Sequence, residues 1–482
     1  MKKKIIIIKI LLLLLLFNSI KSKILFVFEH FRHGARNPCN HIDKNGKDYL
    51  GKEWDFVGEL TNVGKRQHFL LGLHNQEKYK NFLLDYYHPK EILVYSTNKN
   101  RTIESVTANL MGMFFKKGKK INENQKKNSI PQNININNSE FINSVVNDLN
   151  DDSLPFNIAG VPIHLFKEED HDFMLHEPKY CYPVALIKYK LQSSNEMKKH
   201  ADNFKKEFGE KLNKFFEKNG NEENYKNKNF LDTFINVYNF CDHFISDITF
   251  DREDEQIKKL EKEYKIDLNK LSDHCQNLLK IMQFDIVFGR EDVLLMSMSP
   301  PFKKIINWME KRIRLNQLNR SNELDYNSPK FVIYSGHDTT VAGFIKLMNK
   351  LFNSEIINPE FAANIYFELV FNENNNSYFV NYVNGDIVLS SIEFNEFKKR
   401  IEKILWSDQK VYKFCDFDYF NVYKIFGIVL MIIIVILVGF LVYYVKKNKS
   451  LKVLNSNKLI NYDSKEIKPI KFSEEESTDK KE

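Results

Sequence analysis

The sequence predicts an α/β fold: a mostly parallel sheet flanked by helices, with a helical cap domain inserted and one transmembrane helix added. Three observations lead to this prediction. Strand-like apolar runs near the start of the chain alternate with segments of helical periodicity, which is typical of a parallel sheet. A long middle region has helical periodicity and little strand signal. Near the C-terminus, one long apolar segment carries no charge.

The first part of the predicted sheet contains two strands and two helices. The strands are the apolar runs 24–28 and 92–95. A helix between them has Thr61 as its expected N-cap, and a second helix is predicted over residues 102–115. We therefore expect residues 23–117 to form the first part of an α/β catalytic domain.

The middle of the chain has a different pattern. Residues 118–150 are polar and rich in asparagine, which indicates a surface insert. From about 184 to 327, apolar residues recur at helical spacing. We expect residues 118–327 to form this polar insert and a mainly helical cap.

Strand-like runs return after the predicted cap, at residues 331–334, 364–371 and 378–383. The last two flank the sequence NENNN, which is typical of a hairpin loop. Residues 328–415 are therefore predicted to complete the α/β domain.

The first residues have the features of a secretory signal peptide. Lysines at positions 2–4 precede the run 5–17, which is apolar apart from Lys9, and small polar residues follow, with Ser22 at the expected cleavage point. We expect residues 1–22 to be removed. The alternative is an uncleaved membrane anchor, although the run is shorter than the roughly 20 residues that span a bilayer.

Residues 425–445 form the predicted transmembrane helix. Lys446, Lys447 and Lys449 follow directly, and such basic flanks belong on the cytoplasmic side of a membrane. The chain is therefore expected to be a type I membrane protein, with residues 446–482 as its cytoplasmic tail.

Cysteine usage and charge narrow the class of protein. All five cysteines precede the predicted membrane helix, at Cys39, Cys181, Cys241, Cys275 and Cys415. Their spacings match no zinc pattern, so we expect one or two disulfides, an oxidising compartment and no metal. Candidate glycosylation sites on the same side are Asn137, Asn319 and Asn375.

The net charge of +8 is modest for 482 residues, which argues against a nucleic-acid partner.

Polar clusters follow three of the predicted strands. The residues are Arg32, His33 and Arg36 after the first strand, Arg101 after the second, and His337 and Asp338 after the third. Because ligands of open parallel sheets bind outside the carboxyl ends of the strands, we expect these segments to face one crevice. A single such residue would be typical of a surface or a satisfied core position, as we expect for Glu29 and His30.

Together, these side chains suit chemistry on a phosphate group. Each arginine fork can bond two oxygens at once, so three forks would neutralise and orient a tetrahedral anion. A neutral imidazole can attack phosphorus, and a carboxylic acid can give a proton to the departing oxygen.

The motif FRHGARNP fits the Arg-His-Gly-x-Arg signature of the histidine acid phosphatase family, which this sequence resembles. The segments GELTNVGKRQHFLLG, YSTNKNRTIESV and GHDTTVAGF look like further blocks of that family, in the same order. The C-terminal membrane helix and short tail are similar to those of the lysosomal and prostatic acid phosphatase branch.

The resemblance implies roles for the clustered residues. His33 corresponds to the nucleophile that becomes phosphohistidine, and Asp338 corresponds to the proton donor. The implied phosphate-binding residues are Arg32, Arg36, Arg101 and His337. The family's fold is a phosphoglycerate mutase-like α/β domain with a smaller, mostly helical domain over the active site. No metal or organic cofactor is implied.

The resemblance also implies a disulfide between Cys181 and Cys415, whereas Cys241 either pairs with Cys275 or stays free. The implied activity is that of an acid phosphatase acting on small-molecule or protein phosphomonoesters, in a lysosome or vacuole or at the cell surface. Homodimers occur in the family. The alternatives are a catalytically silent receptor or adhesion ectodomain, and a phytase or sugar-phosphate phosphatase of the same superfamily.

Overall fold

The computed structural model describes residues 22–39, 47–54, 56–131, 139–165, 181–219, 230–415 and 419–459. The chain divides into two units, residues 1–415 and 416–482, which are described separately. All but the last residue of the predicted signal peptide (1–22) lie outside the described residues, as do the sequon at Asn137 and the end of the predicted tail.

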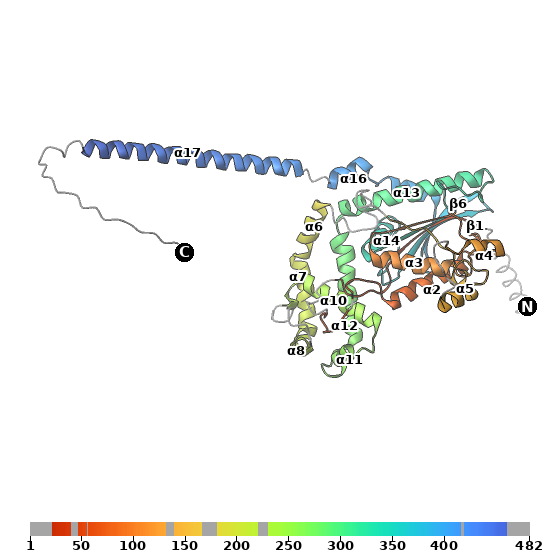
Figure 1. The fold of residues 1–482 in the computed structure, drawn as a ribbon. Helices are drawn as coiled ribbons and strands as arrows, with labels where there is room; N and C mark the ends of the chain where they lie inside the picture. Colours follow the sequence, from red (N-terminus) through yellow and green to blue (C-terminus); the bar gives the residue numbers. More distant parts are fainter. Residues whose placement is uncertain are drawn as a thin grey trace, which may run out of the picture. The chain divides into compact units, whose positions relative to one another are not determined.

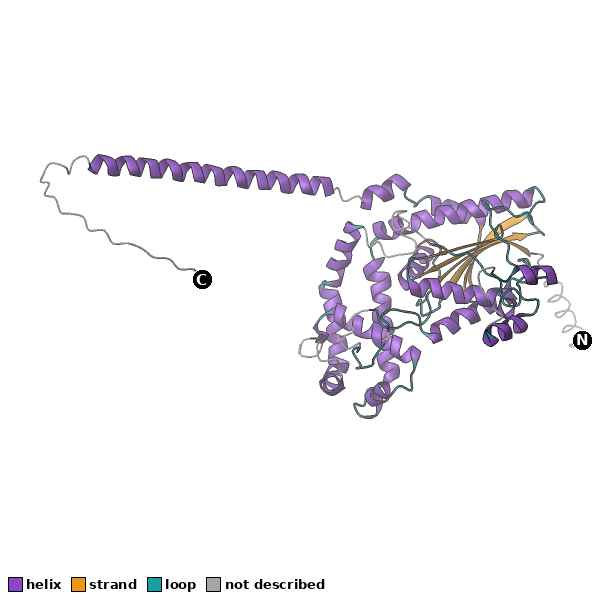
Figure 2. Cartoon of the chain, viewed as in Figure 1, coloured by secondary structure: helices purple, strands orange, loops and turns teal. Residues whose placement is uncertain are grey.

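A seven-stranded sheet is the centre of the first unit, with the order β3-β2-β4-β1-β5-β6-β7 (Figure 2). The strands are β1 (Ser22–Arg32), β2 (Ile92–Ser96), β3 (His164–Leu165), β4 (Phe331–Gly336), β5 (Asn364–Asn372), β6 (Ser377–Asn384) and β7 (Ile387–Glu393). This confirms the predicted α/β class. The sheet is mixed rather than mostly parallel: β3, β2, β4 and β1 pair in parallel, whereas β1, β5, β6 and β7 pair antiparallel. Short turns join β5, β6 and β7, and such turns can join only antiparallel neighbours.

Helices cover both faces of the sheet (Figure 1). On one face, α2 (Asn62–Lys78) and α3 (Asn100–Met113) pack on β1 and β2, and Thr61 caps α2 as predicted. On the other face lie α13 (Glu291–Gln317) and α14 (Asp338–Phe352). Alternate residues of β1 serve the two faces, because successive side chains of a strand point to opposite sides. Both faces of the central strands β1 and β4 are thus largely buried.

The remaining helices form the insert, the cap and the last turns of the first unit. They are α4 (Glu123–Asn128), α5 (Glu140–Leu149), α6 (Tyr182–Gln192), α7 (Asn195–Phe204), α8 (Glu210–Asn219), α10 (Phe234–Phe250), α11 (Glu255–Lys262), α12 (Leu268–Ile281), α15 (Phe394–Glu402) and α16 (Asp408–Cys415). Helices α7, α8, α10, α11 and α12 surround a separate apolar core, and Figure 1 shows them gathered beside the sheet. Two elements within the range 118–327 belong to the sheet layer instead: β3 pairs with β2, and α13 packs on β1.

Two disulfides link the described cysteines. Cys181 bonds to Cys415, which confirms the implied pair, and Cys241 bonds to Cys275, which settles the alternative left open above. Cys39 is not bonded to another cysteine. The asparagines of two predicted sequons, Asn319 and Asn375, are exposed.

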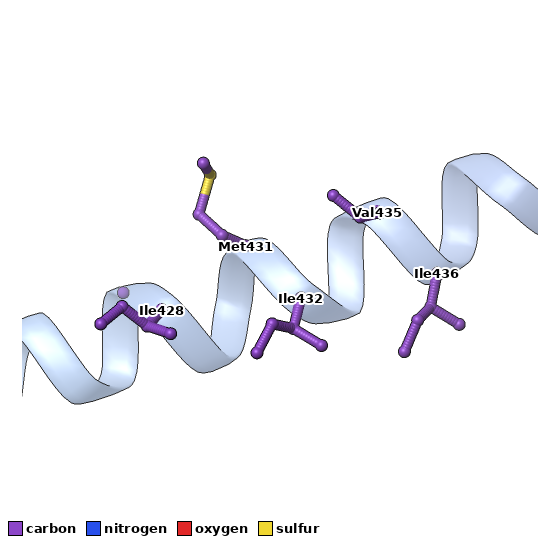
Figure 3. Close-up of a pocket in the computed structure, with 6 residues that line it drawn as sticks. Ile428, Met431, Ile432, Val435 and Ile436 are labelled. Atoms are coloured by element: carbon purple, nitrogen blue, oxygen red, sulfur yellow. The ribbon is translucent and has the colours of Figure 1, made fainter.

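The second unit contains one long helix, α17 (Tyr419–Leu459). Its segment Gly427–Lys449 is long and apolar enough to cross a membrane, with a mean hydropathy of 3.1. Figure 3 shows apolar side chains projecting from this segment, among them Ile428, Met431 and Val435. The shallow hollow between them is lined by this helix alone, so it has the character of a lipid-facing surface rather than of a ligand site.

Candidate active site

The register of the parallel strands brings the predicted site residues together. Arg32 at the end of β1 lies opposite Gly336 at the end of β4, and the backbone N–H of His33 donates to the Gly336 carbonyl at 3.0 Å. The rings of His33 and His337 are consequently 5.6 Å apart between centroids. Sequence positions separated by about 300 residues therefore meet at one edge of the sheet.

Two glycines hold the loop after β1 close to the start of α2. A Cβ on Gly34 would lie 2.5 Å from the carbonyl oxygen of Gly64, and a Cβ on Gly64 would lie 2.2 Å from that of Ala35. Both distances are shorter than real Cβ contacts, so side chains at these positions would separate the two backbones. The backbone N–H of Gly34 also donates to Ser105 Oγ of α3 at 3.1 Å. The loop that carries His33 is thus fixed to both helices of this face.

A hydrogen bond fixes the ring of His33 and leaves one ring nitrogen unprotonated. Its Nδ1 lies 2.9 Å from the carbonyl oxygen of Gly34. A carbonyl oxygen only accepts hydrogen bonds, so Nδ1 carries the proton and Nε2 keeps its lone pair. Burial lowers the pKa of His33 well below its usual 6.5, and the charges of Arg101 and Arg32 lower it further. The imidazole is therefore neutral, because burial and the neighbouring positive charges both disfavour its protonated form.

Three arginines surround this histidine, and two of them are almost fully buried. Arg32 donates to the Pro359 carbonyl at 2.9 Å and lies over the ring of Phe361, 4.1 Å from its centroid. The Nε–H groups of Arg32, Arg36 and Arg101 are buried without a hydrogen-bond partner among the described residues. Buried donors are normally paired, so three orphaned guanidinium N–H groups indicate a place for a tetrahedral anion.

His337 and Asp338 lie at the N-terminus of α14. Arg101 Nη2 lies 3.5 Å from His337 Nδ1, and His337 Nε2 lies 3.2 Å from Thr97 Oγ1. An arginine approaches a ring nitrogen as a donor, so Nδ1 is the unprotonated nitrogen and Nε2–H donates to Thr97. The positive end of the α14 macrodipole adds to the attraction for an anion here.

Asp338 has two partners that fix its carboxyl group. Gln283 Nε2 donates to Asp338 Oδ2 at 3.0 Å, and Arg32 Nη2 forms an ion pair with the same oxygen at 3.3 Å. The other oxygen, Oδ1, accepts the backbone N–H of Thr339 at 2.8 Å. Since the Asp338 side chain keeps 19% of its surface exposed, it can still face a substrate.

The family model described as "Histidine phosphatase superfamily (branch 2)" matches residues 23–384 of this chain. The chain belongs to this superfamily. Bovine prostatic acid phosphatase is 25% identical over 359 residues, which are 74% of this chain and 75% of that protein. Human lysosomal acid phosphatase is 40% identical over 90 residues, 18% of this chain. That match spans only about a fifth (21%) of the lysosomal protein.

Solved structures of two phytases share the fold. The structure of the phytase from Citrobacter braakii matches with a TM-score of 0.54 and 14% identity, covering 81% of this chain and 99% of that one. The Hafnia alvei phytase in complex with tartrate has a TM-score of 0.53 at 12% identity, over 80% of this chain and 98% of that one. At these identities the likeness establishes the architecture alone.

All six residues predicted from the sequence of this superfamily member lie in one site, and four further contacts come from residues that the sequence did not single out. These are Thr97, Asp242, Gln283 and Phe361. Thr97 belongs to the motif STNKNRT and could have been included. The other three lie in cap or loop segments without a recognisable pattern, and only the folded chain brings them here.

Glu29 and His30 lie outside the site, as expected. His30 is fully buried, with Nδ1 3.0 Å from the Tyr334 carbonyl oxygen and Nε2 2.9 Å from Thr340 Oγ1. Burial lowers its pKa to about 4, so it is a neutral structural residue. Glu29 points to the opposite face, where both carboxyl oxygens accept hydrogen bonds from Asn75 Nδ2.

Proposed function

We propose that this chain is an acid phosphatase that hydrolyses phosphate monoesters through a phosphohistidine at His33. The observation that carries the proposal is the neutral His33 imidazole, with Nε2 unprotonated, beside three arginines whose Nε–H groups have no partner among the described residues. Such donors hold phosphate oxygens, and such an imidazole attacks phosphorus.

In the first step, the lone pair of His33 Nε2 forms a bond to phosphorus while the ester P–O bond breaks. Asp338 gives its proton to the departing oxygen, so the alcohol leaves neutral. In the second step, water attacks the phosphohistidine, and its proton returns to Asp338 as the N–P bond breaks. Inorganic phosphate leaves and both side chains regain their starting states.

Binding of the substrate prepares Asp338 for this role. In the free protein its Oδ2 is paired with Arg32 at 3.3 Å. A bound phosphate dianion competes for the same guanidinium, because it offers more charge and more acceptor oxygens. The carboxyl group then loses part of its cationic partner.

The electrostatics of the site favour work at acid pH. A histidine with an ordinary pKa is largely protonated below about pH 6, and a protonated imidazole cannot attack. Burial and the surrounding arginines lower the pKa of His33 well below 6.5, so the nucleophile survives in acid.

The proposal extends to the location of the enzyme. The predicted N-terminal signal peptide, the apolar segment Gly427–Lys449 and two disulfides together support a type I membrane protein whose catalytic unit is lumenal or extracellular. The lysosomal and prostatic relatives favour a lysosome or vacuole, or the cell surface. Glycans at Asn137, Asn319 and Asn375 would fit that compartment.

The test is hydrolysis of an aryl phosphate by the full-length chain in detergent, from about pH 4 to about pH 8. We expect activity that is highest in acid, is abolished by His33→Ala and persists in His88→Ala, a matched change just before the amino end of β2. Denaturing the enzyme during turnover should trap an acid-labile phosphoenzyme in the wild type and not in His33→Ala. A folded wild-type protein without activity across this range would support the silent-ectodomain alternative instead.

A further inference from the structure

The cap contributes one carboxylate to the phosphate site. Asp242, on α10, lies with Oδ1 and Oδ2 at 2.9 Å and 3.0 Å from Arg36 Nη2. Both side chains are largely buried, with 12% of Asp242 and 7% of Arg36 exposed. Arg36 Nη1 is also occupied, since it donates to the Asn37 carbonyl at 3.0 Å. Arg36 therefore offers a phosphate its Nε–H rather than a full fork.

The Asp242 carboxylate is charged. Burial opposes ionisation, but the positive charges of Arg36 and His243 outweigh burial, so the pKa of Asp242 lies below its ordinary value. The charge of Asp242 also acts on Arg32 and Arg101, which shows that it is near the whole arginine cluster.

We propose that Asp242 makes the site selective for phosphomonoesters with an uncharged or cationic leaving group and disfavours substrates that carry a second phosphate beside the scissile one. This inference rests on the proposed phosphatase activity. It assigns Asp242 the role of a specificity residue that acts through its charge and through Arg36.

The balance of charge is the first argument. In the reactive form described above, Asp338 is protonated, so it no longer offsets the positive charge of the arginines. The charged Asp242 then lowers the net positive charge around the phosphate by one. Without Asp242 this additional positive charge would remain and would attract a further phosphate. The cap thus supplies an anion where a polyphosphate site needs a cation.

The second argument concerns the walls near the nucleophile. Phe361 lies against Arg32 and is 6.0 Å from the His33 ring between centroids. An aromatic wall accommodates an apolar or aryl leaving group and offers no donor to a second phosphate. Asp242 and Phe361 therefore act in the same direction on substrate choice.

The experiment compares Asp242→Asn with wild type in the full-length chain, using inositol monophosphate and inositol hexakisphosphate as matched substrates. The readout is the ratio of their kcat/KM values, which a purely structural loss would leave unchanged. We expect the ratio to move toward the hexakisphosphate by about tenfold, because a like charge beside the second phosphate is removed. Asp251→Asn, an exposed carboxylate at the end of the same helix, should keep the wild-type ratio.

Two further measurements keep the inference testable if Asp242→Asn fails to fold. Asp242→Glu keeps the charge and should keep the wild-type ratio. In the wild type, inorganic phosphate should inhibit more strongly than inositol hexakissulfate, a polyanion that is not hydrolysed. An unchanged ratio in Asp242→Asn, or stronger inhibition by the hexakissulfate, would overturn the inference. Absence of activity on both substrates in the wild type would instead remove the proposed function itself.

Discussion

Glu29 should make the protein more stable in acid than at neutral pH. Its carboxyl group is fully buried in β1, and burial raises its pKa from 4.5 to about 7 in spite of hydrogen bonds from Asn75 and Asn364. Between these pH values the folded state binds more protons than the unfolded state, so stability falls as the pH rises. The stabilisation that protonated Glu29 adds to the free energy of unfolding is fully present below pH 4.5 and is lost by about pH 7. A shift of this size corresponds to about 3 kcal/mol.

The assay is urea unfolding of wild type and Glu29→Gln at about pH 4.5 and about pH 7.5, compared as differences between the two pH values. Other groups titrate in both proteins, so the difference between the two proteins in how much unfolding free energy they lose over this pH range isolates Glu29. The variant should lose less stability over this range than the wild type, by about 3 kcal/mol. Glu77→Gln, at a carboxylate with 75% of its side chain exposed, should lose as much unfolding free energy between the two pH values as the wild type. Equal losses of unfolding free energy in Glu29→Gln and wild type would refute the reasoning.

Two further predictions concern catalysis and stability. Asp338→Asn should slow alkyl phosphates by roughly 10²-fold or more but activated aryl phosphates much less, because only poor leaving groups need the proton; equal slowing in steady-state assays would exclude Asp338 as the donor. Cys181→Ser breaks a disulfide that closes a separation of 234 residues, so the free energy of unfolding should fall by roughly 2–5 kcal/mol in urea titrations. Cys39→Ser, at an unbonded cysteine, should stay within about 0.5 kcal/mol of wild type, and a Cys181→Ser variant that matches it would contradict the prediction.

The site residues on strand ends could be predicted from the sequence because topology carries the argument. Apolar runs mark the strands, and the carboxyl ends of parallel strands meet at one edge, so His33 and His337 could be placed together without coordinates. The hairpin of β5 and β6 was equally predictable, since a short polar loop separates two apolar runs. β7 and the two-residue β3 were missed because neither has a clear alternating pattern in the sequence.

The contributions of the cap could not be predicted in the same way. Asp242 lies in the sequence NFCDHF, where nothing separates it from an ordinary helical aspartate. Its contact with Arg36 depends on how α10 packs, and α10 is held by Cys241–Cys275 and by the apolar core of the cap. Gln283 is similar, since it lies in the π-helical turn Met282–Val287, and such turns are set by packing rather than by local sequence.

The arginines of this site have two consequences that depend on each other. In the proposed reaction they supply donors for the phosphate, and with burial they keep the pKa of His33 well below 6.5. A phosphatase built this way needs no separate base to activate its nucleophile, because the imidazole already carries its lone pair in acid. Acid conditions then supply the proton that Asp338 must hold without removing the nucleophile. Phosphate binding, activation of the nucleophile and activity in acid thus follow from one arrangement of charge. The proposed role of Asp242 is to keep this arrangement from binding other polyanions.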